Sequence, residues 1–526
     1  MTPASRRFPR LALAAASAVV VLAGMTACTG ESPAEETSAA PQAGTTSSAA
    51  AEVIGDVPED LLPYYSQEVS WGGCEAGVAD DFRCATVEVP MNYADPGGES
   101  IDLAVILAES DGSAQGTILV NPGGPGGSGY DAVSENLQGI TTDRLRENFN
   151  FLGFDPRGVG RSTPVQCLTD EELDEERSEY LDPSTPAGLA ASRVSAQELA
   201  DKCAKNSGPV LGFVDTESAA RDMDILRAVA GDEKLNYLGF SYGTFLGATY
   251  AELFPETVGR MVLDGGLDPA ASNEEITLGQ AEGFEKAIRA YVEDCLSSGS
   301  CPLSGTPEQA IETIRALIAS VEASPMTAKD GRTVTVSTFV SGFILPLYND
   351  QNWPVLTQAL EAALQGDPSL MLRLADLSAD RDPDGTYASN STVVFSAINC
   401  LDYPMTSDDQ QMRSDAEELE KASPTLGKYL GYGGITCEAW PYDAVNEPHE
   451  IHASGADDLL VIGTTGDPAT PYEWSVALAE QLDSATLVTW EGEGHTAYGR
   501  GDECIADTVD DYFIDGTVPS GDKVCS

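Results

Sequence analysis

Short runs of hydrophobic residues alternate with amphipathic stretches along the first half of the chain. The runs predict buried strands at residues 101–108, 116–120, 149–154, 235–240 and 260–264, and helical spacing predicts helices at 131–138, 195–205 and 216–230. Strands that alternate with helices indicate a parallel sheet covered on both faces. The sequence therefore predicts an α/β protein with a doubly wound, mostly parallel sheet and a site at the carboxyl ends of its strands.

The pattern changes in the second half of the chain. Between residues 272 and 399 the alternation gives way to helical periodicity, as in Ile311, Ile314, Leu317, Ile318 and Val321, which we interpret as packing surface. Strand-like runs return at residues 459–463 and 485–490. We therefore expect a first core segment at residues 57–271, an inserted helical lid at 272–399 and a second core segment at 400–526.

A G-x-S-x-G sequence stands between the strand predicted at residues 235–240 and an apolar helix. Gly239 and Gly243 flank Ser241 at a distance of two residues, as a tight strand-to-helix turn requires, because larger side chains would collide there. Such a turn exposes the serine hydroxyl and points the first amides of the helix at the atom under attack. This context predicts that Ser241 is the nucleophile of a serine hydrolase.

A nucleophile of this kind is followed in the chain by an acid and then by a histidine. The chain has three histidines, and only His495 comes after a strand-like run. His449 and His452 lie in a polar stretch with no strand before them. We therefore expect His495 to be the general base.

Two aspartates compete for the role of the acid. Asp467 follows the strand predicted at residues 459–463, whereas Asp264 ends the strand predicted at 260–264. Asp264 stands before two glycines and is equally well explained as a turn residue. We predict Asp467, which would hold His495 in the tautomer that accepts the serine proton.

A glycine-rich loop follows the strand predicted at residues 116–120 and reads Asn121-Pro122-Gly123-Gly124-Pro125-Gly126-Gly127-Ser128-Gly129. Hydrolases of this fold take the second amide of the oxyanion hole from such a loop. We expect the donors to be the amides of Tyr242 and Gly124. Nucleotide binding is the rival interpretation, but no Lys-Ser or Lys-Thr follows and two prolines interrupt the spacing.

These motifs resemble those of the secreted tripeptidyl and prolyl aminopeptidases of the α/β-hydrolase fold, over residues 60–526. The likeness rests on Pro-Gly-Gly-Pro-Gly-Gly at 122–127, Asp-Pro-Arg-Gly-Val-Gly-Arg-Ser at 155–162, Gly-Phe-Ser-Tyr-Gly-Thr at 239–244, Gly-Asp-Pro at 466–468 with Thr-Pro at 470–471, and Gly-His at 494–495. The resemblance implies a serine peptidase that acts on peptides with a free amino end and has a TAP-like carboxyl-terminal region. Asn121-Pro122 stands where many prolyl iminopeptidases have a histidine, so tripeptide release is favoured over proline release.

Two other classes of function remain open. A carboxylesterase or lipase would use the same triad on esters, and a requirement for a free amine in the substrate would separate the two. A lipoprotein that keeps the fold only for binding is the second alternative, and the intact Ser241, Asp467 and His495 argue against it.

An exopeptidase must also compensate the ammonium group of its substrate. Asp402 and Glu438 each lie within two residues of a cysteine, Cys400 and Cys437, that we expect to be bonded together. That bond would place the two carboxylates near each other, where the lid rejoins the core. We expect them to bind the amino end of the peptide.

Cysteine usage indicates export. One of the eleven cysteines is Cys28, and the other ten suit five disulfides in an oxidising compartment. The simplest pairing joins neighbours in the sequence: Cys74 with Cys84, Cys167 with Cys203, Cys295 with Cys301, Cys400 with Cys437, and Cys504 with Cys525. Since no Cys-x-x-Cys pair or histidine cluster has ligand spacing, we expect no metal site and no cofactor.

The amino-terminal 28 residues have the pattern of a targeting sequence. Three arginines precede the apolar run at 11–24, and Met25-Thr26-Ala27-Cys28 resembles a lipobox in which Cys28 is lipidated. A plain secretory peptide cut near Ala27 is the alternative. Residues 29–56, rich in Ser, Ala, Thr and Pro, are expected to form a disordered tether. We expect an exported protein, either secreted or held as a lipoprotein at the outer face of the cytoplasmic membrane.

The net charge narrows the range of partners. A formal charge of −57 over 526 residues would repel nucleic acid. We expect peptide substrates, no nucleic-acid partner, and membrane contact only through the lipid at Cys28, because no other apolar stretch is long enough to span a bilayer.

Overall fold

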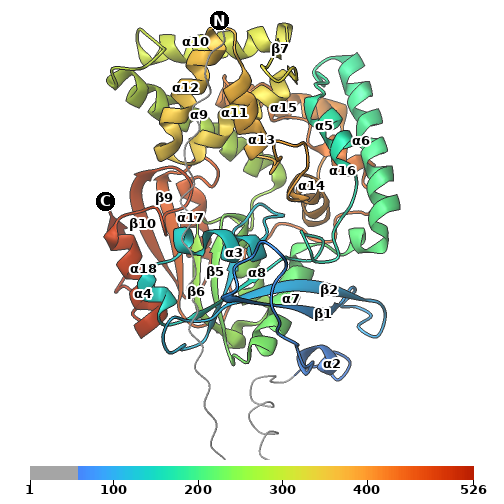
Figure 1. The fold of residues 1–526 in the computed structure, drawn as a ribbon, viewed down its shortest axis with the longest axis vertical. Coiled ribbons are helices and arrows are strands. Elements are labelled where there is room, and N and C mark those ends of the chain that lie inside the picture. Colours follow the sequence, from blue (N-terminus) through green and yellow to red (C-terminus); the bar gives the residue numbers. More distant parts are fainter. Residues whose placement is uncertain (1–56) are drawn as a thin grey trace, which may run out of the picture. The chain divides into compact units, whose positions relative to one another are not determined.

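A nine-stranded sheet organises residues 57–526, which are the residues that the computed structural model describes (Figure 1). Its strands in chain order are β1 (Phe82–Pro90), β2 (Ser100–Ala108), β3 (Thr117–Asn121), β4 (Asn150–Phe154), β5 (Leu235–Phe240), β6 (Val258–Asp264), β9 (Leu459–Gly466), β10 (Ala485–Glu493) and β11 (Lys523–Cys525). Across the sheet the order is β1-β2-β4-β3-β5-β6-β9-β10-β11. Only β2 runs antiparallel to its neighbours, so the predicted mostly parallel α/β sheet is confirmed.

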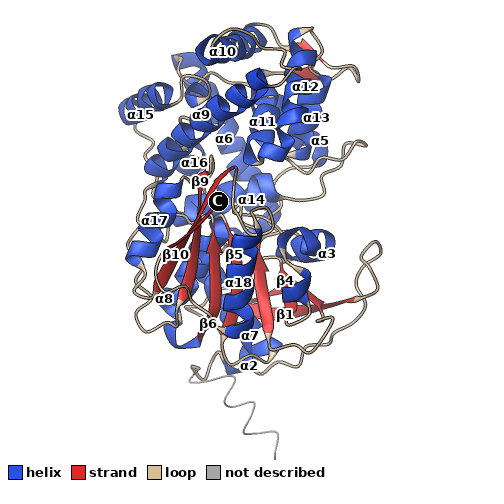
Figure 2. Ribbon diagram, turned by 90° about the vertical axis from the view of Figure 1, so that its left-hand side faces the viewer, coloured by secondary structure: helices blue, strands red, loops and turns tan. Residues whose placement is uncertain are grey.

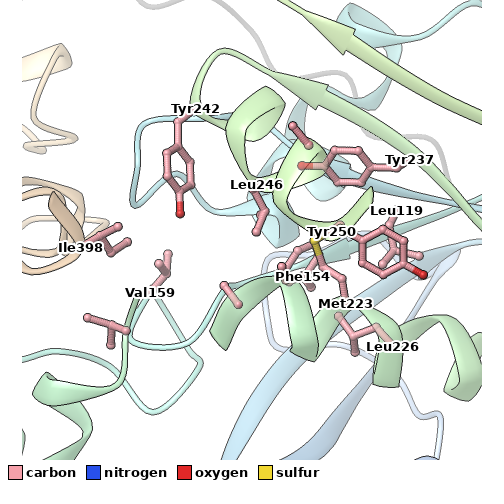
Figure 3. Packing of buried hydrophobic residues seen from close by; sticks show 14 of the residues in the cluster. Leu119, Phe154, Val159, Met223, Leu226, Tyr237, Tyr242, Leu246, Tyr250 and Ile398 are labelled. Carbon is pink, nitrogen blue, oxygen red and sulfur yellow. The ribbon is translucent and has the colours of Figure 1, made fainter. Parts of the chain in front are cut away.

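Helices cover both faces of the sheet. Successive strand residues point to opposite faces, so Leu119 packs in one hydrophobic cluster while Ile118 and Val120 pack in another. The first cluster includes α7 (Thr216–Ala230), α8 (Tyr242–Leu253) and α17 (Tyr472–Gln481), and Figure 3 shows part of it. The second includes α3 (Gly129–Ile140), α4 (Asp143–Arg146) and α18 (Glu503–Asp515).

A group of helices inserted between β6 and β9 forms a lid with its own hydrophobic cluster, seen above the sheet in Figures 1 and 2. Its elements are α9 (Asn273–Ser297), α10 (Pro307–Ala323), the short strands β7 (Met326–Thr327) and β8 (Thr333–Val334), α11 (Val336–Ile344), η3 (Leu345–Tyr348), η4 (Asp350–Asn352), α12 (Trp353–Leu364) and α13 (Ser369–Leu377). α9 begins at Ser272, which forms a capping box with Glu275. The apolar positions predicted on α10 are all buried, as expected for packing surface.

The packing of helices on the lid and on the core does not match the division of the sequence into core and lid segments. α5 (Asp170–Ser178) and α6 (Pro186–Ser207) follow β4 in the chain. α5 packs on α11, and α6 packs on α16 (Gly434–Ala439). α14 (Ser391–Asp402) contributes Val394 and Ile398 to the cluster that packs on the sheet. α15 (Asp409–Ala422) returns to pack on α9, and the 3-10 turn η5 (Gly427–Tyr429) follows it. A helix of the first core segment, α5, thus packs on the lid.

Five disulfides join the ten cysteines of the described residues in the five pairs that the sequence analysis gives, each with an S–S bond of about 2 Å. The predicted signal sequence, Cys28 and the tether lie outside the described residues. Within residues 57–526 no helix combines the length and the apolar character that crossing a bilayer requires.

Candidate active site

Ser241 lies between β5 and α8 with φ 56° and ψ −124°, in the positive-φ region that a strand-to-helix elbow requires. Side chains would not fit beside it. A Cβ at Gly239 would lie 2.4 Å from Tyr237 Cε1, and a Cβ at Gly243 would lie 2.8 Å from the main-chain oxygen of Asn121. Both glycines of the motif are therefore required by crowding.

The glycine-rich loop that follows β3 contacts the elbow directly. A Cβ at Gly123, where φ is 99°, would lie 2.8 Å from Ser241 Cβ. The Gly123 amide donates to Asn121 Oδ1 at 2.9 Å. Among residues 57–526, the amides of Gly124 and Tyr242 donate to no protein group. These two amides are thus free to bind an oxyanion, as the sequence analysis expects of them.

His495 is held by a buried carboxylate. Its Nδ1 lies 2.9 Å from each oxygen of Asp467. The same carboxylate accepts hydrogen bonds from the amides of Ala469, Thr470 and Thr496, at 2.9, 2.9 and 3.0 Å, and from the Thr470 hydroxyl at 3.1 Å. The contact orients the imidazole with its Nδ1–H toward Asp467, which leaves Nε2 to accept a proton.

The competing residues do not join this pair. Asp264 is buried, but its carboxylate accepts from the amides of Ala497 and Tyr498 instead of the imidazole. His449 and His452 are exposed, and their Nδ1 atoms contact main-chain carbonyls. Of the acids and bases considered from sequence, the structure therefore pairs Asp467 with His495.

The nucleophile elbow and the base loop meet at the end of β6. Ser241 N donates to the main-chain oxygen of Asp264 at 2.8 Å, and a Cβ at Gly265 would lie 3.4 Å from His495 Cε1. Within the described residues no hydrogen bond joins the Ser241 hydroxyl to His495. Such contacts are commonly long without substrate and tighten in the reacting complex.

The lid contacts the base loop as well. His495 N donates to the main-chain oxygen of Tyr348 at 2.8 Å, and the two rings meet edge to face at 5.5 Å. Arg500 donates to Asn349 Oδ1 in the lid at 3.0 Å and to the main-chain oxygen of Glu493 at 2.8 Å. The end of η3 is therefore part of the site.

The chain is similar to several known proteins over most of its length. The family model described as TAP-like protein matches residues 423–525. Serine protease Hip1 of Mycobacterium tuberculosis is 35% identical over 90% of this chain and 94% of its own length. Tripeptidyl aminopeptidase of Streptomyces lividans is 30% identical, over 87% and 86%, and carboxylesterase B of M. tuberculosis is 38% identical, over 88% and 91%. The chain belongs to the TAP-like family of α/β-hydrolase serine peptidases.

The carboxylates expected to bind the amino end in this TAP-like chain are not placed for that role. Asp402 is buried, and its oxygens accept from the amide and hydroxyl of Thr216 and from Asn446 Nδ2. Glu438 is exposed and forms an ion pair with Arg193 at 2.9 Å. Although the nearby disulfide forms, the two carboxylates have separate partners, so we correct the expectation that they bind substrate together.

Asp402 is instead linked through Thr216 to Tyr242, the residue that follows Ser241 in the elbow. Tyr242 Oη lies 2.5 Å from Thr216 Oγ1, which in turn donates to Asp402 Oδ2 at 2.5 Å. Figure 3 shows Tyr242 in the same hydrophobic cluster as Ile398 of α14. Burial raises the pKa of Asp402 to about 7. Its environment is therefore that of a buried structural acid.

Three residues of the site have no role in the sequence analysis. Thr470 could have been found, since a threonine three residues after Asp467 is placed to donate to that carboxylate within one turn. Tyr348 and Arg500 carry no such signal, because their contacts join segments about 150 residues apart.

The described residues contain one group of potential metal ligands, Asp502 with Cys504 and Cys525. Its two sulfurs are joined in a disulfide, so they are not the thiolates that a metal would bind.

Proposed function

We propose that this protein removes short peptides, with tripeptides favoured, from the free amino end of its substrates through an acyl-enzyme on Ser241. The observation that carries the proposal is the contact of the buried Asp467 carboxylate with His495, with Nδ1 held at 2.9 Å and Nε2 left for the serine proton. The relative named tripeptidyl aminopeptidase, aligned over most of both chains, supports the choice of reaction.

The reaction runs in two halves. His495 Nε2 takes the proton of the Ser241 hydroxyl while Oγ attacks the scissile carbonyl, and the imidazolium then donates that proton to the departing amine. The released amine carries the remainder of the peptide, and the amino-terminal fragment stays as an ester on Ser241. A water molecule, deprotonated by His495, attacks this ester and restores the serine. Asp467 stays ionised and stabilises the imidazolium throughout.

The oxyanion formed in each half would be bound by the amides of Tyr242 and Gly124. Support comes from their position beside Ser241 and from their lack of protein acceptors among residues 57–526. Donors that are already oriented stabilise the developing charge without reorganisation.

The lid gives a physical reason for exopeptidase action. A Cβ at Gly126 would lie 3.2 Å from the main-chain oxygen of Ser391, and Tyr348 contacts His495, so lid segments adjoin both the oxyanion loop and the base. A chain bound at Ser241 would meet these segments after a few residues. This favours cleavage near one end of the peptide.

The test is product analysis by mass spectrometry on a mixed peptide pool, in which each peptide has a free or an acetylated amino end. We expect tripeptides from the free pool only, and no products from Ser241→Ala. Ser454→Ala is the matched control, because Ser454 is exposed and its hydroxyl contacts only Asp483 among the described residues. Equal cleavage of acetylated peptides would reject the exopeptidase proposal.

Ester hydrolysis is the second candidate, and the relative named carboxylesterase B at 38% identity favours it. The same triad would act, and the two candidates differ in substrate. Comparison of kcat/KM for a tripeptide anilide and for an acyl ester of matched size separates them: the peptidase proposal expects a preference for the anilide that disappears on acetylation.

We also propose that the protein is exported and anchored through a lipid on Cys28, with residues 29–56 as the tether, and that it has no nucleic-acid partner. The lipobox-like sequence and the five disulfides support export, and the charge of −57 argues against nucleic acid. Cys28→Ser should move the protein from the membrane fraction to the medium with unchanged specific activity. Retention of the variant in the membrane fraction would reject the anchor.

A further inference from the structure

Asp264 is the last residue of β6, in the centre of the sheet. It stands opposite Phe240 of β5 and Ile462 of β9, and its side chain is fully buried. The proposed triad does not use it, since Asp467 holds His495.

This residue holds both halves of the proposed catalytic machinery. Its main-chain oxygen accepts the amide of Ser241 at 2.8 Å. Its carboxylate accepts the amide of Ala497 at 3.0 Å through each oxygen and the amide of Tyr498 at 2.7 Å. The nucleophile elbow and the base loop are therefore fixed to one rigid strand end.

The carboxylate also lies within electrostatic reach of the base. The pKa of Asp264 is raised to about 7, because burial and, to a smaller extent, the negative charge of Asp467 outweigh the lowering by the two amides and His495. Arg500 also interacts electrostatically with this carboxylate. The charge of Asp264 is consequently present above neutral pH, where it favours a positive charge on His495.

We propose that Asp264 is a positioning residue that holds the base loop in register with the nucleophile elbow and, as a second buried carboxylate beside Asp467, stabilises the imidazolium formed on His495. The inference rests on the proposed function only in that Ser241, Asp467 and His495 react as a triad. The identity of the substrate does not enter it.

Asp264→Asn tests the charge separately from the shape. An amide oxygen in the place of Oδ2 can still accept both loop amides, whereas the NH2 group replaces the Oδ1 that also faces Ala497 N. The pH dependence of the rate therefore isolates the lost charge from this change in hydrogen bonding. We measure the rate constant for labelling of Ser241 by an alkyl fluorophosphonate from pH 5 to pH 9, in wild type and variant. The wild-type rate should exceed the variant rate about tenfold at pH 8.5, by analogy with a shift of one pKa unit, and the two should converge near pH 5.5, where Asp264 is protonated.

Asp510→Asn is the matched control. Asp510 is also buried and also contacts Tyr498, but through the tyrosine hydroxyl at 2.7 Å instead of the main-chain amide. It should leave the pH dependence of labelling unchanged. A ratio of wild-type to Asp264→Asn rates that is constant with pH would overturn the electrostatic role and leave only a structural one.

The wild-type enzyme supplies a second measurement that does not require the variant to fold. If Asp264 and His495 both affect the reaction, the labelling rate of the wild type must depend on pH through two ionisations, and a profile that a single ionisation fits from pH 5 to pH 9 would overturn the proposal. Because the probe carries no peptide, wild type that labels in this way but cleaves no free-amine peptide would reject the exopeptidase function and leave the inference standing. Labelling that persists in Ser241→Ala would reject both.

Discussion

The nucleophile elbow and the base loop sit side by side but are held in different ways. The elbow is fixed by crowding around its two glycines, since an added Cβ would collide with Tyr237 at Gly239 and with Asn121 at Gly243. The base loop is fixed from a distance. The four consecutive amides of residues 495–498 donate to the Tyr348 carbonyl, to Asp467 and to Asp264, which come from three separate segments of the chain.

This difference shows that one site can combine a local and a non-local construction. A motif that depends on local sterics is visible in five letters of sequence. A loop that depends on distant acceptors is visible only in the fold, and its energy depends on charge, so it should respond to pH and to isosteric changes of acceptors. The predictions below separate the two constructions.

The largest effect is expected for Asp467→Asn, which removes the charge at the centre of the base loop. An amide group cannot accept from all the donors around this carboxylate and can impose the wrong imidazole tautomer. We expect a loss of about 10⁴ in kcat, as for the corresponding change in other Ser–His–Asp enzymes, measured by steady-state hydrolysis of a tripeptide anilide. Asp264→Asn should cost far less, and the reverse ranking would move the acid to β6.

We expect added side-chain volume at the elbow to lower both activity and stability. Gly239→Ala places a Cβ 2.4 Å from Tyr237 Cε1 and 2.5 Å from the Gly243 carbonyl oxygen, so the turn must shift. A displacement of about 1 Å commonly costs on the order of 100-fold in rate, and overpacking about 1–3 kcal/mol in the free energy of unfolding. Activity and thermal unfolding measure the two effects.

Gly231→Ala is the control for Gly239→Ala. Gly231 has φ 85° and no atom within 4 Å of an added Cβ, so the change adds backbone strain without crowding. It should cost about 1 kcal/mol of stability and no activity. If Gly231→Ala lowered activity as much as Gly239→Ala, crowding at the elbow would not be the cause.

The sequence was sufficient for the local half of this comparison. The elbow and the sheet could be predicted because the first depends on residues that are close in sequence and the second on strand periodicity. The neighbour pairing of the ten cysteines agrees with the structure for a related reason, since every pair closes a loop of fewer than 40 residues.

The non-local half could not be predicted. The sequence placed Asp402 and Glu438 together because each lies close to a cysteine of one disulfide. In the structure the Asp402 carboxylate points inward and accepts from Thr216, whereas the Glu438 carboxylate points outward and pairs with Arg193. In the same way, nothing in residues 170–207 indicates that α5 packs on α11 of the lid and α6 on α16, because an amphipathic stripe does not identify its partner.

A smaller effect is expected where the lid meets the base loop. Arg500→Ala removes hydrogen bonds to Asn349 in the lid and to the Glu493 carbonyl. We expect about a tenfold loss in kcat with little change in KM, since hydrogen bonds to a charged group contribute roughly 1.5–3 kcal/mol, part of which water replaces. In a double-mutant cycle with Asn349→Ala the losses should not add, because both changes remove one contact. Additive losses would show that Arg500 acts only within the base loop.

The last effect is on stability and not on activity, and it is a pH-dependent change at Asp402. Its pKa is raised to about 7 in the folded protein, from about 4 when unfolded. Between these values the folded state binds the extra proton, so the wild type loses stability as pH rises from about 4 to 7. Asp402→Asn has no such titration, so its Tm relative to wild type should be higher at pH 8 than at pH 5. Exposed Asp443→Asn should show no such trend, and a difference that falls with pH would contradict the burial argument.

The hydrogen bond from His495 N to the Tyr348 carbonyl has a consequence for how this fold can be recombined. Every residue has a main-chain carbonyl, so an alignment of related chains would not mark position 348 as part of the active site, whatever side chain stands there. A chimera that received a foreign lid would keep all three residues of the triad and still lose one support of its base unless the new segment followed the same backbone path. In this protein the lid is not an interchangeable module that only selects substrates, since the shape of its backbone is one of the components of the catalytic centre.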